Sequence, residues 1–173
     1  MRGANVLKAP IIFFLTIMGA TATLAQDSTV IGTYDAWTAH TYKEDAGIVC
    51  FMMSKPTDEE GAYTIRGDTF ALVTHRPSDD SLDVVSIVAG YEYKENSDVR
   101  LQTGSIKYDM FTLGDRAWYR DEATDKTMVK AMIRGSKLTV RGTSSRGTLT
   151  TDTYSLSGFT AAHRAITDAC TAE

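Results

Sequence analysis

The sequence predicts a mainly β fold: an antiparallel β-sandwich or barrel-like domain with two short helices, the second at the C-terminus. Segments rich in Val, Ile, Thr, Tyr and Phe recur about every ten residues, and short turn clusters such as RPSDDS and KENSD separate them. Helical periodicity appears in only two segments of the mature chain. Short strands at this spacing favour a sandwich or a barrel. The chain has no internal repeat and no Pro-rich linker, which indicates one domain.

The strand predictions follow these β-prone runs. One of them, GIVCFMMS, is continuously apolar and therefore indicates a buried strand. The predicted strands are 36–42, 47–54, 69–76, 82–93, 97–103, 106–113, 116–120, 137–143 and 148–156.

The first predicted helix lies in DEATDKTMVKAMIRGSK. Asp125 is the expected N-cap, because its carboxylate can accept a hydrogen bond from the free amides of the first turn. Met128, Met132 and Ile133 are expected to share one face, and Gly135 is a suitable stop.

The second predicted helix starts near Gly158, with Ser157 as its N-cap. Thr160 stands where a full capping box has Glu. Helical spacing gives this helix one apolar stripe that should face the core. The stripe consists of Phe159, Ala162, Ile166 and Cys170.

Residues 1–25 have the layout of a cleaved signal peptide: Arg2 and Lys8 come first, an apolar core follows, and small residues end the segment. Cleavage after Ala25 leaves a single domain, 26–173, and a cut after Ala22 is the alternative. The apolar run is short for a spanning helix, which needs roughly 20 apolar residues. No transmembrane segment is expected after cleavage, and the predicted location is periplasmic or secreted.

The net charge argues against one class of partner, nucleic acids. Loss of Arg2 and Lys8 with the leader changes the formal net charge from −4 to −6. A nucleic-acid binder needs a cationic surface for phosphates, so no nucleic-acid partner is expected.

The two cysteines, Cys50 and Cys170, are expected to form a disulfide. Export would place them in an oxidising compartment, where two thiols in a small domain usually pair. The last helix turns Cys170 towards the core, and Cys50 lies in the buried strand. Two free buried thiols are the alternative. A metal site is disfavoured, because no second Cys or His stands at ligand spacing from either thiol.

The C-terminal stretch TSSRGTLTTDTYSLSGFTAAHRAITDAC resembles the ending of the invasion associated locus B family, exported proteins of Gram-negative bacteria. MVKAMIRGSKLTVRGTS is similar to the family's preceding segment, and the regions of Trp37, Cys50, RGDTFALVTHRP and VSIVAGYEY are similar to its earlier half. A midway cysteine pair found in many members is absent here. The resemblance implies a β-rich periplasmic or outer-membrane-associated protein. Some members are linked to host-cell invasion and others occur in bacteria that invade nothing. It supplies no catalytic residues.

Candidate catalytic and metal-binding residues give weak signals. Ser155, Ser157 and His163 suggest a serine hydrolase, but YSLSGFT lacks the first glycine of a nucleophile elbow. His40, His75 and His163 are scattered, with none at i+2 to i+4 from another, so satisfied or solvated side chains are expected, and a metal site assembled in three dimensions is the alternative. No catalytic residue, metal or cofactor is predicted.

Three acidic segments also need an interpretation: TDEEG (57–61), PSDDSLD (77–83) and DEATD (121–125). None has the alternating pattern and distal Glu of a Ca²⁺ loop, so solvated turns are expected.

Two groups of residues are candidate partner-binding sites. Basic side chains gather between residues 130 and 146, where a positive patch could meet anionic lipid, lipopolysaccharide or an acidic partner. Ordinary surface charge balance is the alternative. The patch consists of Lys130, Arg134, Lys137, Arg141 and Arg146.

The second group is Arg116, Trp118 and Arg120, which share one face of a predicted strand while Tyr119 points to the other. Aromatic residues flanked by arginines are enriched at interfaces, whereas core packing of Trp118 is the alternative.

The sequence therefore predicts an exported, non-enzymatic cell-envelope protein that binds an envelope or host-surface protein or an anionic lipid. The alternatives are a periplasmic enzyme of unidentified activity, and an envelope-structural or chaperone-like protein.

Overall fold

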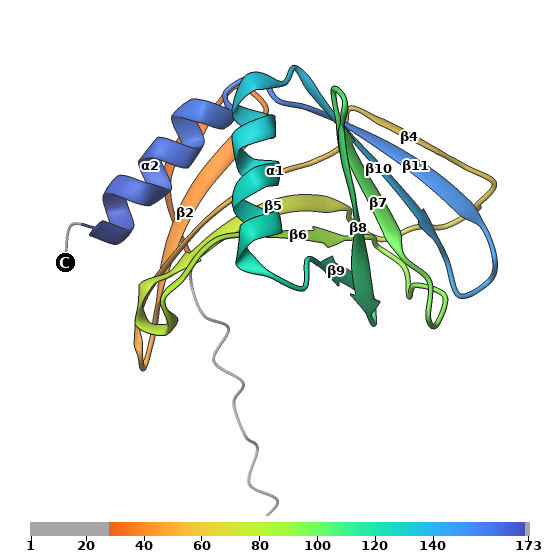
Figure 1. Cartoon of the computed structure of the whole chain (residues 1–173), viewed down its shortest axis with the longest axis horizontal. Coiled ribbons are helices and arrows are strands. Elements are labelled where there is room, and N and C mark those ends of the chain that lie inside the picture. The colour runs from red at the N-terminus through yellow and green to blue at the C-terminus, as the bar shows by residue number, and fades with distance from the viewer. Residues whose placement is uncertain (1–27, 172–173) are drawn as a thin grey trace, which may run out of the picture.

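The computed structural model describes residues 28–171, which form one antiparallel sheet of eleven strands with two α-helices (Figure 1). The predicted leader, 1–25, lies outside the described residues. The strands are β1 (Thr29–Tyr34), β2 (Trp37–Glu44), β3 (Gly47–Ser54), β4 (Asp58–Gly61), β5 (Phe70–Arg76), β6 (Ser81–Val88), β7 (Val99–Thr103), β8 (Ile106–Leu113), β9 (Arg116–Trp118), β10 (Lys137–Thr143) and β11 (Leu149–Ser155). The helices are α1 (Glu122–Arg134), α2 (Phe159–Thr171) and a short 3₁₀ turn, Pro77–Asp79.

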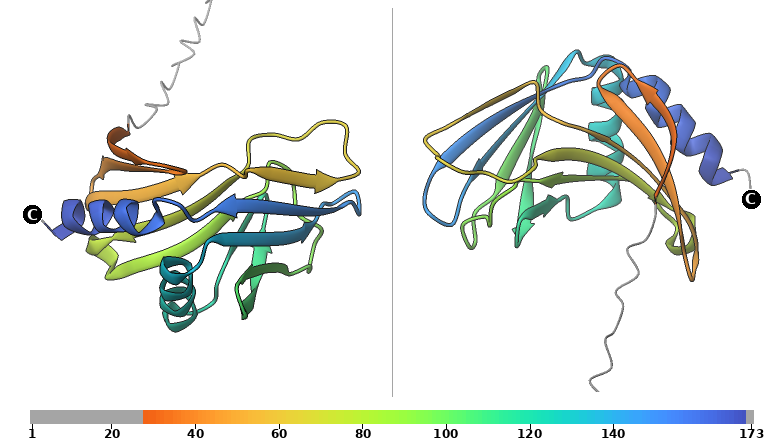
Figure 2. Two further views of the ribbon diagram at one scale, coloured as in Figure 1. Left: turned by 90° about the horizontal axis from the view of Figure 1, so that it is seen from above. Right: turned by 180° about the vertical axis from the view of Figure 1, so that it is seen from behind.

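The strands follow the order β1-β2-β3-β5-β6-β9-β8-β7-β10-β11-β4, and every neighbouring pair is antiparallel. The sheet bends into an arch rather than lying flat (Figures 1 and 2). The predicted mainly β class, with a helix at the C-terminal end, is confirmed.

Alternation along the strands gives the sheet an inner and an outer face. Ala39, Met52, Val73 and Val85 occupy successive paired positions across β2, β3, β5 and β6, and all four are almost fully buried. Neighbouring residues in each strand point to the other face, as the two-residue period of a strand requires. Both helices pack on the inner face: α1 contacts β6 and β8, α2 contacts β1, β2, β3 and β5, and the two helices touch each other.

The predicted stripe of α2 is confirmed, since all four of its members are buried. The ring of Phe159 meets that of Trp37 edge-on, with centroids 4.9 Å apart, and the Trp37 indole donates a hydrogen bond to the Ser155 carbonyl at 2.9 Å. The stripe ends in a disulfide between Cys50 on β3 and Cys170 on α2. The predicted pairing is therefore present, and it fixes the end of α2 to β3, the third strand from one edge of the sheet.

Gly158 explains how the chain turns into α2. Its φ is +82°, and a Cβ there would lie 1.9 Å from the Tyr34 carbonyl oxygen. Only glycine fits such a left-handed position pressed against another backbone. The predicted N-cap role of Ser157 is wrong, because its hydroxyl donates to the Asp35 carboxylate at 2.8 Å instead.

Helix α1 starts earlier than predicted. Asp121 is its N-cap and accepts a hydrogen bond from the Thr124 amide at 2.9 Å. Asp125 is instead buried in the first turn, where its carboxylate accepts the Val85 amide at 2.8 Å. Met128 and Met132 face the core as expected, but Ile133 is 40% exposed, because it lies beside the apolar stripe and not within it.

Several strand boundaries differ from the prediction. β1 was not predicted, the predicted strand 82–93 ends at Val88, and 116–120 is a strand only to Trp118. The acidic segment 57–61, expected to be a turn, contains β4, which pairs with β11. Pairing with a neighbouring strand overcomes the low β-propensity of Asp and Glu, and charged residues suit an edge strand because they discourage pairing with other chains.

Candidate binding surfaces

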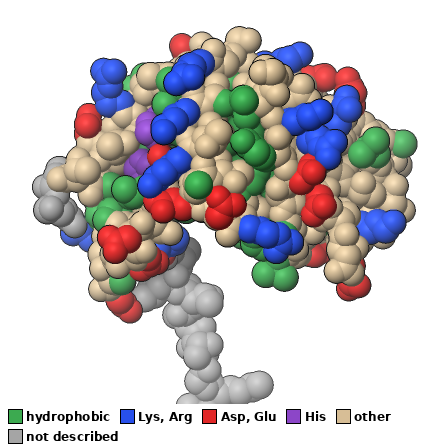
Figure 3. All heavy atoms as spheres, in the orientation of Figure 1, with side chains coloured by type: hydrophobic (Ala, Val, Ile, Leu, Met, Phe, Trp, Pro, Cys, Tyr) green, Lys and Arg blue, Asp and Glu red, His purple; other side chains and the backbone are tan. Residues whose placement is uncertain are grey.

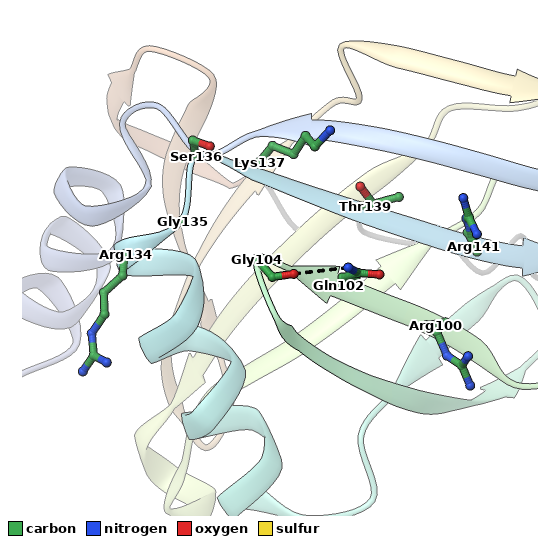
Figure 4. Close-up of a pocket in the computed structure, with 9 residues that line it drawn as sticks. All are labelled: Arg100, Gln102, Gly104, Arg134, Gly135, Ser136, Lys137, Thr139 and Arg141. Carbon is green, nitrogen blue, oxygen red and sulfur yellow. Dashed lines mark hydrogen bonds between the residues drawn. The ribbon is translucent and has the colours of Figure 1, made fainter.

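The junction of α1 and β10 shapes a groove of about 580 Å³ that carries basic side chains (Figure 4). Strand β7 forms its other wall, and the Gln102 amide donates a hydrogen bond to the Gly104 carbonyl there at 3.2 Å. The groove is lined by Arg100, Gln102, Gly104, Arg134, Gly135, Ser136, Lys137, Thr139 and Arg141. We call it the basic groove.

The two-residue period of a β-strand places the charged side chains of β10 on the outer face of the sheet. In β10, Leu138 and Val140 are buried in the core, whereas Lys137 and Arg141 are exposed on the outer face. Arg141 pairs directly with Arg100 of β7 across the sheet. Two like charges at directly opposed positions destabilise a sheet, so this surface keeps positive charge at a cost in stability.

Most of this charge is not neutralised within the protein. Arg100 is held by two hydrogen bonds to the Asp109 carboxylate, at 2.7 and 2.8 Å. Among the described residues, Arg134, Lys137 and Arg141 have no ion pair. Figure 4 shows that the Arg134 side chain points away from those of Lys137 and Arg141, so the three do not converge on one point. Such an arrangement suits an extended anionic surface better than one small anion.

The structure divides the predicted basic patch. Arg134, Lys137 and Arg141 line the basic groove, and Lys130 lies beside it in a hollow that Arg134 also lines. Arg146 lies elsewhere, in a hollow formed with the loop between β4 and β5. Sequence reasoning missed Arg100, because only the β7–β10 pairing brings it to this surface.

A second groove, of about 510 Å³, lies on the outer face of β3, β5, β6 and β9 and includes two predicted residues, Arg116 and Trp118. Trp118 is half-buried, and its ring lies 5.9 Å from that of Phe111. Arg120 places its guanidinium 4.8 Å from the centre of the Phe111 ring. The interpretation of Trp118 as a core residue is wrong, since it packs on the outer face. The groove is lined by Tyr42, Phe51, Leu72, Thr74, Arg76, Val84, Ser86, Arg116 and Trp118.

The scattered histidines His75 and His163 come together in the structure, and both rings are hydrogen-bonded, as expected of satisfied side chains. His75 ends β5 and His163 lies on α2, yet their rings are 5.4 Å apart and Asp83 of β6 lies between them. His163 Nε2 is 2.7 Å from Asp83 Oδ1. Burial raises the pKa of Asp83, but the hydrogen bond and charge of His163 outweigh it and lower that pKa overall. Burial lowers the pKa of His75, which is 3% exposed.

The residues suggested for a serine hydrolase do not assemble. The Ser155 hydroxyl accepts the Ser157 amide, the Ser157 hydroxyl donates to Asp35, and the imidazole of His163 contacts Asp83 instead of a serine. No nucleophile–base pair forms among these three residues, so the geometry that a Ser–His mechanism requires is not present.

A sequence profile of the Invasion associated locus B (IalB) protein family matches residues 37–167, which is well over half of the chain. This chain belongs to the IalB family. The match runs from Trp37 at the start of β2 into α2, and so covers both candidate grooves and the histidine pair. No curated protein and no solved structure gives a significant match.

One structural feature of this IalB-family protein bears on its location. Its disulfide is typical of proteins that fold in an oxidising compartment. Within residues 28–171, no helix is both long and apolar enough to cross a membrane.

Proposed function

We propose that this IalB-family protein is an exported, non-enzymatic binding protein of the cell envelope, and that it docks on an anionic lipid surface through the basic groove. The observation that carries the proposal is that three exposed cations without an ion pair, Arg134, Lys137 and Arg141, line one groove of an acidic protein. The resemblance to exported proteins, the signal-like leader and the disulfide support export.

Electrostatics favours a lipid surface as the partner. Each Lys or Arg near an anionic bilayer contributes about 1 kcal/mol of attraction. Headgroup phosphates repeat across a plane, so they can meet cations that are spread along a groove. The attraction should weaken with added salt, because exposed charges are screened over about 8–10 Å at physiological ionic strength.

The test is vesicle sedimentation with the mature protein. Arg134→Glu combined with Lys137→Glu should lower binding to phosphatidylglycerol-containing vesicles by roughly 30-fold or more, since two charges contribute about 2 kcal/mol. Binding to pure phosphatidylcholine vesicles should be weak for both proteins. Melting should change little, because both side chains are exposed and unpaired.

The matched control is Lys94→Glu combined with Arg164→Glu, which makes the same change in net charge at exposed positions outside the groove. This control should bind nearly as well as the wild type at moderate salt. An equal loss of vesicle binding in both double variants would show that overall charge, and not the basic groove, causes the loss. Failure of the wild type to bind anionic vesicles at low salt would refute the lipid partner, and salt-sensitive capture of an acidic protein instead would replace it.

A further inference from the structure

The cluster of His75, Asp83 and His163 is the one group of at least three His, Cys, Asp or Glu side chains, among the described residues, whose candidate ligand atoms all lie within 4.8 Å of one another. The three residues come from the end of β5, the start of β6 and the middle of α2. They border a hollow of about 300 Å³. Figure 3 shows histidine side chains, in purple, on one face of the molecule.

We propose that His75, Asp83 and His163 form a binding site for a divalent transition-metal ion of the zinc type, with a further coordination position open to the hollow. Two imidazoles and one carboxylate suit Zn²⁺ and its neighbours in the first transition row, whereas Mg²⁺ and Ca²⁺ prefer oxygen ligands alone. Three protein ligands with a fourth position open to water or a small ligand are an established arrangement of zinc in proteins.

The distances are close to those that coordination needs. Zinc bonds of about 2.0–2.1 Å in a tetrahedron place neighbouring ligand atoms about 3.3 Å apart. Asp83 Oδ1 is 2.7 Å from His163 Nε2 and 3.9 Å from His75 Nδ1. The carboxylate therefore needs to move by only a few tenths of an ångström, away from one ring and towards the other. Rotation of the Asp83 side chain can make this shift, while the two ring nitrogens, which lie within 4.8 Å of each other, must also approach by rotation of the imidazoles.

Hydrogen bonding already fixes the tautomer of His75 that a metal ion requires. The Thr167 hydroxyl donates to the His163 carbonyl at 2.9 Å, so its oxygen accepts the proton of His75 Nε2 at 3.1 Å. With that proton on Nε2, the lone pair of His75 lies on Nδ1, the nitrogen that faces Asp83. Metal-binding histidines typically donate their other N–H to such a partner. Thr167 is thus a positioning residue for the site.

Two contacts compete with the ion and make this an exchangeable site. The Asp83 amide donates to His75 Nδ1 at 3.0 Å, and His163 shares a hydrogen with Asp83 Oδ1. A bound ion would replace both. Asp80 and Asp83 also have left-handed backbones, with φ of +53° and +62°. Non-glycine residues in this region are often held there by functional constraints, and here the turn brings both aspartates to the rim of the hollow.

The site would connect the same elements as the disulfide. The disulfide joins α2 to β3, and an ion held by His163, His75 and Asp83 would join α2 to β5 and β6. Binding to the folded protein alone stabilises it in proportion to the logarithm of ligand concentration. Zn²⁺ should therefore raise the melting temperature in a concentration-dependent way.

The experiment is calorimetric titration of untagged mature protein with Zn²⁺, together with thermal melting at each metal concentration. The wild type should bind one ion per chain. His163→Gln and Asp83→Asn should each lose the calorimetric signal and the melting shift. Thr167→Val should weaken binding by about 10–100-fold, as loss of a partner that orients a metal ligand typically does. His40→Gln is the control, because His40 lies on β2 and stacks on Phe51 away from the cluster.

Circular dichroism of each variant without metal shows whether it is folded, so that a loss of metal binding can be told apart from a loss of structure. Cobalt gives a second measurement, since Co²⁺ in a four-coordinate site absorbs visible light much more strongly than aqueous Co²⁺. This strong absorption should be present in the wild type and absent in His163→Gln. The proposal is overturned if the wild type shows no saturable binding in a large excess of Zn²⁺. It is equally overturned if folded His163→Gln and Asp83→Asn bind as the wild type does, or if His40→Gln loses binding to the same extent.

Discussion

The ion pair between Arg66 and Asp152 gives the sharpest prediction about stability. Both side chains are 3% exposed, and both terminal guanidinium nitrogens bond the carboxylate, one of them at 2.7 Å. Arg66 Nε also donates to the Ala89 carbonyl at 2.7 Å. The guanidinium lies 5.5 Å from the ring centre of Tyr63 and 5.0 Å from that of Tyr91. Arg66 thereby ties the loop between β4 and β5 to the inner face of β11.

The perturbation is Arg66→Met, which keeps an unbranched apolar stem and removes the charge. Asp152 would then be a buried carboxylate without a counter-ion. Removing one partner of a buried pair costs about 3–5 kcal/mol. Protonation of Asp152 offers an alternative, but taking up a proton at pH 7 against an unfolded pKa near 3.9 costs about 4 kcal/mol. Either route gives a loss of about 3–5 kcal/mol, or roughly 8–16 °C in melting temperature for a domain of this size.

Urea denaturation and thermal melting at pH 7 measure this loss. The matched control is Lys55→Met, which breaks the Lys55–Asp68 pair of 2.9 Å, whose side chains are 64% and 72% exposed. That exposed pair should contribute about 1 kcal/mol or less. The loss in Arg66→Met should also shrink in acid, because a protonated Asp152 no longer needs a counter-ion.

The double variant Arg66→Met with Asp152→Leu decides the mechanism. Replacing both partners of a buried pair with apolar residues is often neutral or stabilising, so the double variant should be more stable than Arg66→Met alone. The reasoning is refuted if Arg66→Met costs no more than Lys55→Met. It is also refuted if the two substitutions in the double variant simply add.

Two further predictions concern the core. Cys170→Ser removes the disulfide, whose two cysteines are 120 residues apart, and should lower the free energy of unfolding in urea by about 2–5 kcal/mol. The reduced wild type should be as unstable as this variant. A variant as stable as the oxidised wild type would contradict the prediction. Burial raises the pKa of Asp125 to about 6, above its unfolded value of about 3.9, so its ionised form destabilises the native protein as pH rises through that range. Asp125→Asn should therefore gain stability over wild type as pH rises from about 4 to 7, by up to about 3 kcal/mol. A difference in melting temperature that ignores pH would contradict it.

The features that sequence predicted well are those that depend on local period. Alternation in FALVTHR and KLTVRGT identifies β5 and β10, and the spacing from Phe159 to Cys170 identifies the buried face of α2. The disulfide followed from that face together with an apolar strand around Cys50. In each case the residues that show the pattern lie close together in the sequence, within a single strand or within about three turns of one helix.

The features that sequence missed depend on pairing between distant segments. β4 is acidic and becomes a strand only because β11 offers its edge. Arg100 reaches the basic groove through the register of β7 with β10. His75 and His163 meet because α2 crosses β5, and neither residue carries a local pattern that indicates the other. Such contacts depend on the topology of the fold, which cannot be read from the spacing of residues along the chain.

The two faces of the sheet separate stability from binding in this protein. In β10 and β11, Leu138, Val140 and Asp152 point inward to the core and the buried ion pair, while Lys137 and Arg141 point outward from the same strands. Alternation makes the two sets nearly independent, because a substitution on the outer face removes no inner contact. Charge reversal in the basic groove should therefore change affinity with little effect on melting. Loss of Arg66 should instead lower stability while the groove keeps its affinity in the molecules that remain folded.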